Sequence, residues 1–400
     1  MRIEIPEFVS VLVERLEECG EEAYIVGGGL RDSLLGKTPS DYDMTTSALP
    51  ERMLEIFSDF RVIKTGLKHG TLTVLSDGRP VEITTFRIDG GYTDSRHPDS
   101  VSFTRCLSED LARRDFTVNA MAYNERTGLV DKFGGIDDLR NGIIRAVGEP
   151  HKRFTEDALR IMRAFRFSAQ LGFKIEEETL LAARECRDGL DNIAKERIFS
   201  ELMKLLHSPC SADALALMRD NGILRYILGD YCPSERIFPL ICKLPDNDEA
   251  RLGMLLYEAD ERQRREILSS LKCSNRQRSG AMAVAAGASA SLSSRADVSR
   301  FLAKYGRDAS DALCASVILG NSDSSVFSLA EGNDAPRAIS DLAVGGKDME
   351  TLGLRGKEIG EMLSFLLDIA IDEPSKNNKE SLLQIAESEK NKIKDRNKNA

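Results

Sequence analysis

The chain has 400 residues, 42% hydrophobic and 30% charged, which is typical of a globular protein of two or three domains and excludes collagenous and membrane classes. The formal net charge of −10 argues against a surface that is basic throughout, although it permits a local basic groove. Eight scattered cysteines without a Cys-x-x-Cys pair argue against a zinc site and favour reduced thiols in a cytoplasmic protein. At the N-terminus Glu4, Glu7 and Glu14 interrupt the apolar residues, so we expect neither a signal peptide nor a membrane span.

The first 140 residues combine strand and helix signals. Apolar residues at helical spacing predict an opening helix over residues 6–19, and Tyr24-Ile25-Val26 predicts a buried strand that leads into a helix over 30–35. The other predicted elements are strands over 61–64, 70–75 and 81–86, a polar loop over 88–99 and a helix over about 108–123. Together they predict an α+β fold with a sheet of about five strands flanked by helices.

Helical periodicity dominates from residue 156 onward. Over 156–167 the apolar residues that share one side of the predicted helix are Ala158, Ile161, Met162 and Phe165. The charged residues on the opposite side are Glu156, Asp157, Arg160, Arg163 and Arg166. Three arginines and two carboxylates on one side of a helix exceed what solubility requires, so we expect this face to bind a ligand.

A glycine-rich turn lies close to a pair of aspartates. Three glycines from Gly27 to Gly29 would let backbone N–H groups approach an anion, and Arg31 could close over a phosphate. Asp41 and Asp43 lie two residues apart in an extended segment, so both carboxylates would project from one face as ligands for Mg²⁺. Either feature alone is common and carries little weight, but together they favour a nucleotide site. Glu82 could add a third carboxylate if its strand pairs alongside.

Three motifs in order resemble those of one family. GGGLRDSLLG at residues 27–36, followed by Asp41-Tyr42-Asp43, resembles the first motif of class II tRNA nucleotidyltransferases, the CCA-adding enzymes of the polymerase-β superfamily, which also includes bacterial poly(A) polymerases. DLARRDFTVNA at 110–120 resembles the second motif, and RFTEDALR at 153–160 resembles the base-selecting motif. A weaker similarity at 341–348 extends the resemblance over nearly the whole chain.

The resemblance implies a polymerase-β-like nucleotidyltransferase head followed by an all-α neck, body and tail. It also implies template-independent addition of C, C and A to the 3′ end of tRNA from CTP and ATP, with release of pyrophosphate. In this family two magnesium ions are held by the paired aspartates, here Asp41 and Asp43. The implied nucleotide contacts are the phosphates at Gly28 and Arg31, and the ribose at Arg114 and Asp115. Without the resemblance, residues 113–115 would be interpreted as an exposed charge cluster on a helix.

Asp157 and Arg160 lie three residues apart on the predicted helix and would be adjacent on its surface. A carboxylate acceptor beside guanidinium donors matches the edges of cytosine and adenine. Uracil and guanine present the reversed polarity and would leave buried groups unpaired, at about 1–3 kcal/mol each. The resemblance implies that this pair selects the base and that Arg163 and Arg166 line the nucleotide site. An intrahelical ion pair, worth about 0.2–0.5 kcal/mol, is the alternative, but it leaves the two further arginines unexplained.

Four parts are expected: a catalytic head over 1–140, a neck over 141–205 that carries the nucleotide-selecting helix, a body over 206–340, and a tail over 341–400 with tRNA contacts and a disordered end. DGGYTDSRHP at 89–98 resembles the loop that the family needs for the final A, with His97 where a second Arg is common. This loop favours complete CCA synthesis. GLRGKEIG at 353–360 departs from a longer family element that contains proline.

We expect tRNA, CTP and ATP as partners, with no membrane and no obligate protein partner. An enzyme that adds only CC or only A, a poly(A) polymerase and an inactive tRNA-binding protein stay open as alternatives.

Overall fold

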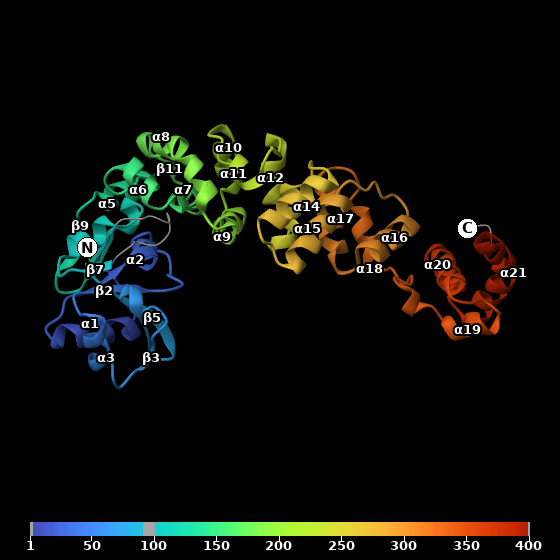
Figure 1. Ribbon diagram of the computed structural model, residues 1–400, viewed down its shortest axis with the longest axis horizontal. Helices are drawn as coiled ribbons and strands as arrows, with labels where there is room; N and C mark the ends of the chain where they lie inside the picture. Colours follow the sequence, from blue (N-terminus) through green and yellow to red (C-terminus); the bar gives the residue numbers. More distant parts are fainter. Residues whose placement is uncertain (1–2, 91–100, 399–400) are drawn as a thin grey trace. The chain divides into compact units, whose positions relative to one another are not determined.

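The computed structural model describes residues 3–90 and 101–398 and divides the chain into two compact units, residues 1–232 and 233–400 (Figure 1). The first unit contains a mixed sheet followed by helices, and the described residues of the second unit form helices joined by loops, with no strand. The α+β fold class is therefore confirmed. The finer division into head, neck, body and tail stays a prediction.

The main sheet has seven strands in the order β3-β4-β5-β2-β1-β8-β9, rather than the five expected. Its strands are β1 (Ala23–Val26), β2 (Asp43–Thr46), β3 (Arg61–Ile63), β4 (Thr71–Ser76), β5 (Arg79–Thr85), β8 (Met121–Asn124) and β9 (Gly128–Asp131). β2 and β5 run parallel, and their register places Asp43 opposite Glu82. The other neighbouring strands are antiparallel. Helices α1 (Glu7–Glu18) and α3 (Pro50–Ile56) pack on this sheet.

The helix predicted over 108–123 is wrong beyond its first turns. Helix α4 (Leu107–Ala112) ends early, a 3₁₀ turn η2 (Thr117–Asn119) follows, and the chain then enters β8. β8 is buried along its whole length and pairs with β1, about a hundred residues earlier in the chain. This non-local pairing overrides the local helical pattern.

The predicted polar loop over 88–99 begins inside a small hairpin formed by β6 (Arg87–Asp89) and β7 (Val101–Phe103). Residues 91–100, which carry most of the loop that resembles the family's A-adding element, lie outside the described residues.

The three glycines form the first turn of α2 (Gly27–Leu34), directly after β1, rather than a loop before the helix. Gly27 has φ +73°, a left-handed conformation that favours glycine. A Cβ on Gly29 would lie 2.5 Å from the carbonyl oxygen of Asp41, so glycine lets the aspartate segment lie directly against α2.

The prediction of one continuous helix over 156–167 is also wrong, because the helix is interrupted at Asp157. Helix α6 (Pro150–Glu156) ends there, Asp157 is extended (φ −144°, ψ 101°), and α7 (Leu159–Leu171) begins two residues later. The predicted apolar face is confirmed by the burial of Ala158, Ile161, Met162 and Phe165. The other elements of the first unit are α5 (Gly135–Asn141), β10 (Ile143–Ile144), β11 (Lys174–Ile175), α8 (Glu177–Glu185), α9 (Lys195–Leu206), α10 (Ser211–Asp220) and α11 (Arg225–Leu228).

The second unit is a succession of helices. They are α12 (Phe238–Ile241), α13 (Asp248–Leu255), α14 (Glu261–Ser270), α15 (Asn275–Gly287), α16 (Arg295–Tyr305), α17 (Ala309–Ile318), α18 (Ser325–Glu331), α19 (Gly346–Thr351), α20 (Lys357–Asp372) and α21 (Lys379–Lys398). Side chains of Asn247, Asp260, Ser274 and Ser294 cap the N-termini of α13 to α16. Across the described residues, no helix combines the length and apolar character that crossing a bilayer requires.

The last helix runs further than the sequence predicts. The end of the chain is expected to be disordered, but α21 is helical to Lys398. Leu382, Ala386 and Ile393 are buried in a cluster with residues of α19 and α20. The packing of these three side chains stabilises the helix. Its otherwise polar composition is the reason why the sequence does not predict it.

Candidate active site

A polar cavity of about 540 Å³ in the first unit gathers residues from α2, the start of β2, the segment after α4, and α7. Ten of the eleven candidate site residues line it: Gly28, Arg31, Asp41, Asp43, Arg114, Asp115, Asp157, Arg160, Arg163 and Arg166. The eleventh, Glu82, lies outside the lining but is the strand partner of Asp43. Segments more than a hundred residues apart in the chain thus meet at one cavity.

The aspartate pair sits at the entrance to β2. Burial, together with repulsion from Asp41 and Glu82, raises the pKa of Asp43 to about 6, and Arg114 opposes this rise. A buried carboxylate whose charge is unfavourable fits a site that a divalent cation would stabilise. In the described parts of the chain, however, no three His, Cys, Asp or Glu side chains converge as a ligand group, so the role of Glu82 as a third ligand stays a prediction.

Residues 113–115 follow α4 and face the cavity, so the alternative of an exposed helical charge cluster is wrong. The side chains of Arg113 and Arg114 are 18% and 17% exposed. Both contact the buried Asp110, at 2.9 and 3.6 Å, and Asp110 in turn accepts a hydrogen bond from Thr45 Oγ1. The Nε of Arg114 is buried and has no hydrogen-bond partner within the described chain.

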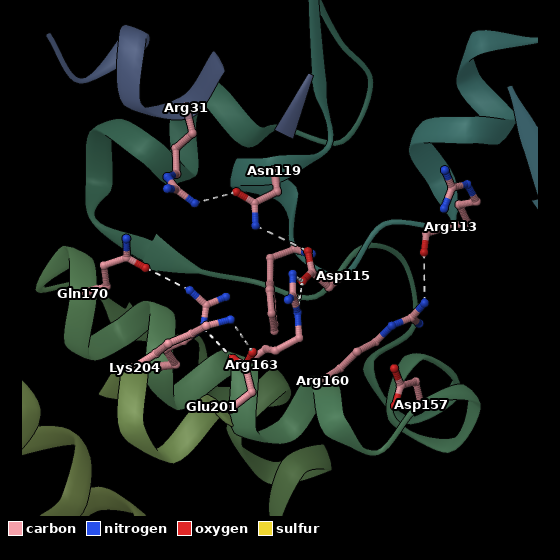
Figure 2. A network of polar contacts seen from close by, with 12 residues as sticks. Arg31, Arg113, Asp115, Asn119, Asp157, Arg160, Arg163, Gln170, Glu201 and Lys204 are labelled. Atoms are coloured by element: carbon pink, nitrogen blue, oxygen red, sulfur yellow. Dashed lines mark hydrogen bonds and ion pairs between the residues drawn. The ribbon is translucent and has the colours of Figure 1, made fainter. Parts of the chain in front are cut away.

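Asp115 lies at the centre of a polar network (Figure 2). Its Oδ1 accepts hydrogen bonds from the backbone N–H of Phe116 (2.8 Å) and from Asn119 Nδ2 (3.4 Å). Its Oδ2 accepts from Arg163 Nε (2.7 Å) and contacts Nη2 (2.6 Å). Asn119 also accepts from Arg31 Nη1 (2.9 Å), which joins α2 to α7. Burial alone would raise the pKa of Asp115, but Arg163, the charge of Arg160 and the hydrogen bond from the Phe116 N–H lower it to about 2.

Three arginines surround the ring of Phe167. The guanidinium carbons of Arg31, Arg163 and Arg166 lie 5.3, 5.3 and 3.8 Å from its centroid. Arg166 also donates to Glu201 Oε2 (2.5 Å) on α9. The aromatic ring and this carboxylate hold the guanidinium groups together despite their mutual repulsion, which makes this end of the cavity suited to an anion such as a triphosphate.

Asp157 and Arg160 line the cavity together, but in the described chain they are paired with other groups rather than with each other. The alternative of an intrahelical ion pair is therefore wrong, because Asp157 lies between α6 and α7 rather than on one helix with Arg160. Arg160 donates to Glu156 Oε2 (2.8 Å) and to the carbonyl oxygens of Arg153 (3.1 Å) and Arg113 (3.0 Å). Asp157 Oδ1 accepts from the N–H of Leu159, and its Oδ2 from Arg197 Nη2, both at 3.1 Å.

Several residues at the site have no role that was predicted from the sequence. They are Asn119, Phe167, Gln170, Arg197 and Glu201. Asn119 lies inside the second motif, and Phe167 follows directly after Arg166, so both could have been included. Arg197 and Glu201 are spaced i, i+4 on an amphipathic helix, but nothing in that pattern identifies partners about forty residues earlier.

The comparisons with known proteins agree with this architecture. Residues 23–145 match the model of the poly A polymerase head domain, and residues 172–235 match the model of the probable RNA and SrmB-binding site of polymerase A. The CCA-adding enzyme of Leuconostoc mesenteroides is 47% identical over 227 residues, 56% of each chain, and that of Enterococcus faecalis is 43% identical over 272 residues, 65% of this chain and 64% of the relative. In sequence, the chain thus spans little more than half the length of the curated relatives it matches.

In structure, the match extends over the whole chain. The CCA-adding enzyme of Bacillus stearothermophilus, solved in complex with CTP, has a TM-score of 0.81 and 31% identity, over 98% of this chain and 100% of that one. The Thermotoga maritima CCA-adding enzyme, solved with tRNA, has a TM-score of 0.68 at 22% identity and supports the fold alone. With a head domain of the poly(A) polymerase type and a full-length relative at 31% identity, the chain belongs to the family of CCA-adding enzymes.

Proposed function

We propose that the protein adds C, C and A to the 3′ end of tRNA from CTP and ATP, without a nucleic-acid template and with release of pyrophosphate. The observation that carries this proposal is that one cavity is lined by Asp41 and Asp43, by a cluster of arginines, and by both Asp157 and Arg160, which we propose to be the base-reading edge. These are the parts needed for nucleotidyl transfer, triphosphate binding and base selection. The CTP complex of the B. stearothermophilus relative supports the same function.

In this proposal Asp41 and Asp43 hold Mg²⁺, and Glu82, the strand partner of Asp43, is the third carboxylate. When bound, the cation supplies neutralisation of triphosphate charge and a lower pKa for the attacking 3′-hydroxyl. Hard carboxylate oxygens are the donors that Mg²⁺ prefers, and the raised pKa of Asp43 reflects its burial and the nearby charges of Asp41 and Glu82, which Arg114 opposes.

The proposed phosphate contacts are the N-terminal turn of α2 at Gly28 and the guanidinium groups of Arg31, Arg163 and Arg166. Arg114 and Asp115 are the proposed ribose contacts. The two oxygens of Asp115 already accept four donors, from Phe116, Asn119 and Arg163. A ribose hydroxyl that donates to Asp115 therefore has to displace one of these donors. Because two of the four come from Arg163, recognition of the sugar is coupled to the position of that side chain.

Asp157 and Arg160 keep enough free hydrogen-bonding groups to read a base. Arg160 has five N–H donors, of which three are used by the partners described above, so two remain. Each Asp157 oxygen accepts one hydrogen bond and keeps one acceptor site. This edge can pair with cytosine and adenine, whereas uracil and guanine leave groups on both sides unpaired.

We propose that the RNA 3′ end approaches through a neighbouring cavity of about 960 Å³. It shares Arg113 with the nucleotide cavity and is also lined by His151, Lys152 and Arg153. Glu109, Glu149 and Glu156 line it too, so the proposal depends on its place beside the nucleotide cavity and not on an excess of positive charge. The eight free cysteines support a place of action in the cytoplasm.

The test is extension of a tRNA transcript that ends before its 3′ trinucleotide, in Mg²⁺, with each nucleotide alone and in pairs. CTP alone should add two residues, ATP alone none, and the two together CCA, read by sequencing the products. Arrest after two C residues would identify a CC-adding enzyme, addition only to transcripts that already end in CC an A-adding one, and repeated A on any RNA a poly(A) polymerase.

An absence of incorporation with every nucleotide would leave only an inactive tRNA-binding protein and would overturn the proposal. Asp43→Ala tests the metal site, and its matched control is Asp59→Ala, which removes an exposed carboxylate from the same unit and should leave incorporation unchanged.

A further inference from the structure

Asp157 is held by a group from another helix, and this contact has a consequence for base selection. We propose that Arg197 on α9 is a positioning residue that fixes the Asp157 carboxylate at the angle needed to distinguish CTP and ATP from UTP and GTP. The inference rests on the proposed function, because it takes Asp157 to be part of the base-reading edge.

Because Asp157 lies between the end of α6 and the start of α7, it is not held in a helical conformation. Its backbone is extended, and within the described residues the carboxylate accepts two hydrogen bonds, from the Leu159 N–H and from Arg197 Nη2. The first is local and moves with the start of α7. The second comes from forty residues further along the chain and fixes the other oxygen, so that the two contacts together define the plane of the carboxylate.

Arg197 is suited to this role by its own surroundings. It lines the nucleotide cavity, its side chain is only 25% exposed, and its Nη1 is buried without a hydrogen-bond partner in the described residues. A buried unpaired donor at the cavity wall is costly unless another group meets it. A base seated against Asp157, or a water between them, would supply an acceptor.

The same face of α9 supports both ends of the cavity. Glu201, one turn after Arg197, pairs with Arg166 in the arginine cluster, while Ile198 and Leu202 are fully buried and anchor the helix. α9 also packs directly against α7. Arg197 therefore reaches Asp157 from a rigid support, which is what an orienting residue requires.

Loss of Arg197 should affect selectivity more than chemistry. Without it, the carboxylate keeps one contact and can turn about its side-chain torsions, so that it accepts hydrogen bonds from more than one direction. The carboxylate pair and the arginine cluster are unchanged, so the transfer step itself should continue.

The experiment compares kcat/KM for CTP with that for UTP on the full chain, using a tRNA transcript that lacks CCA. The variants are Arg197→Gln, Arg197→Lys, Asp157→Asn and the double variant, with Glu196→Gln as the control. Glu196 is exposed on the same turn of α9 and lies outside the cavity, so its substitution should leave the preference unchanged.

Arg197→Gln should lower the CTP preference about tenfold, the loss expected for one charge-assisted hydrogen bond, with a smaller change in kcat for CTP. Arg197→Lys keeps the charge but not the planar fork, and should retain part of the preference. The double variant should be no worse than Asp157→Asn alone, because Arg197 acts through that carboxylate.

The outcomes distinguish failure of the base-reading role of Asp157 from failure of the positioning role of Arg197. If Asp157→Asn keeps the full preference, the base-reading assignment of the proposed function is wrong. If Asp157→Asn loses the preference while Arg197→Gln keeps it, or if the losses add in the double variant, the positioning role is overturned. Should Arg197→Gln not fold, Arg197→Lys decides, and an unchanged preference in that variant refutes the inference.

Discussion

The ion pair between Asp115 and Arg163 should make a measurable, pH-dependent contribution to stability. Burial and the Arg163 contact together leave the pKa of Asp115 at about 2, against an ordinary value of 3.8. This difference corresponds to about 2 kcal/mol of stabilisation at neutral pH. Because the pKa in the folded state is lowered, the contribution is present above pH 4 and is lost as the pH falls towards 2; about 1 kcal/mol remains at pH 3.

Asp115→Asn therefore should unfold with a free energy about 2 kcal/mol below that of the wild type at pH 7, and the gap should narrow to about 1 kcal/mol at pH 3. Urea unfolding followed by tyrosine fluorescence suits this protein, because it has no tryptophan and six of its eight tyrosines lie in the first unit. Asp137→Asn is the control: its exposed pair with Arg140 should contribute less than about 0.5 kcal/mol at either pH. A gap for Asp115→Asn that is equal at pH 7 and pH 3 would refute the reasoning.

Three further predictions concern the same cavity. Arg160→Ala should lower the preference for CTP over UTP at least about tenfold in single-nucleotide extension, and a preserved preference would place base reading elsewhere. Asp43→Ala should reduce incorporation to background without lowering the free energy of urea unfolding, because the raised pKa of Asp43 shows that its charge is unfavourable in the folded state; unchanged incorporation would contradict the metal assignment. Phe167→Leu should lower the free energy of unfolding by about 2 kcal/mol. It should also raise KM for CTP and ATP alike, since the three arginines around its ring are the proposed contacts of the phosphates common to both; a change for one nucleotide only would contradict this.

The parts of the site that could be predicted from sequence are those in which neighbours in the chain are neighbours in space. The glycine-rich segment and the pair of Asp41 and Asp43 are short and local, and both line one cavity as the sequence predicts, although the glycines belong to the first turn of α2 rather than to a loop. The interruption of the helix at Asp157 could not be predicted, because the helical periodicity of the sequence continues across it. The contact to Arg197, which fixes the residue there, comes from a different helix. β8 was missed for a related reason, since its partner β1 lies about a hundred residues away.

The charge of the chain and the charge of its cavity have opposite signs, and this bears on the proposed need for a divalent cation. The protein carries −10 overall, but the cavity lining contains seven arginines and five aspartates, a difference of +2. Two of those arginines, Arg160 and Arg166, already pair with Glu156 and Glu201. A nucleoside triphosphate brings about four negative charges, so the protein's own groups leave a deficit of positive charge beside Asp41 and Asp43, the pair proposed to hold the metal. We therefore expect the arginines and a cation held by Asp41 and Asp43 to act together, because the arginines alone do not balance the charge of a triphosphate.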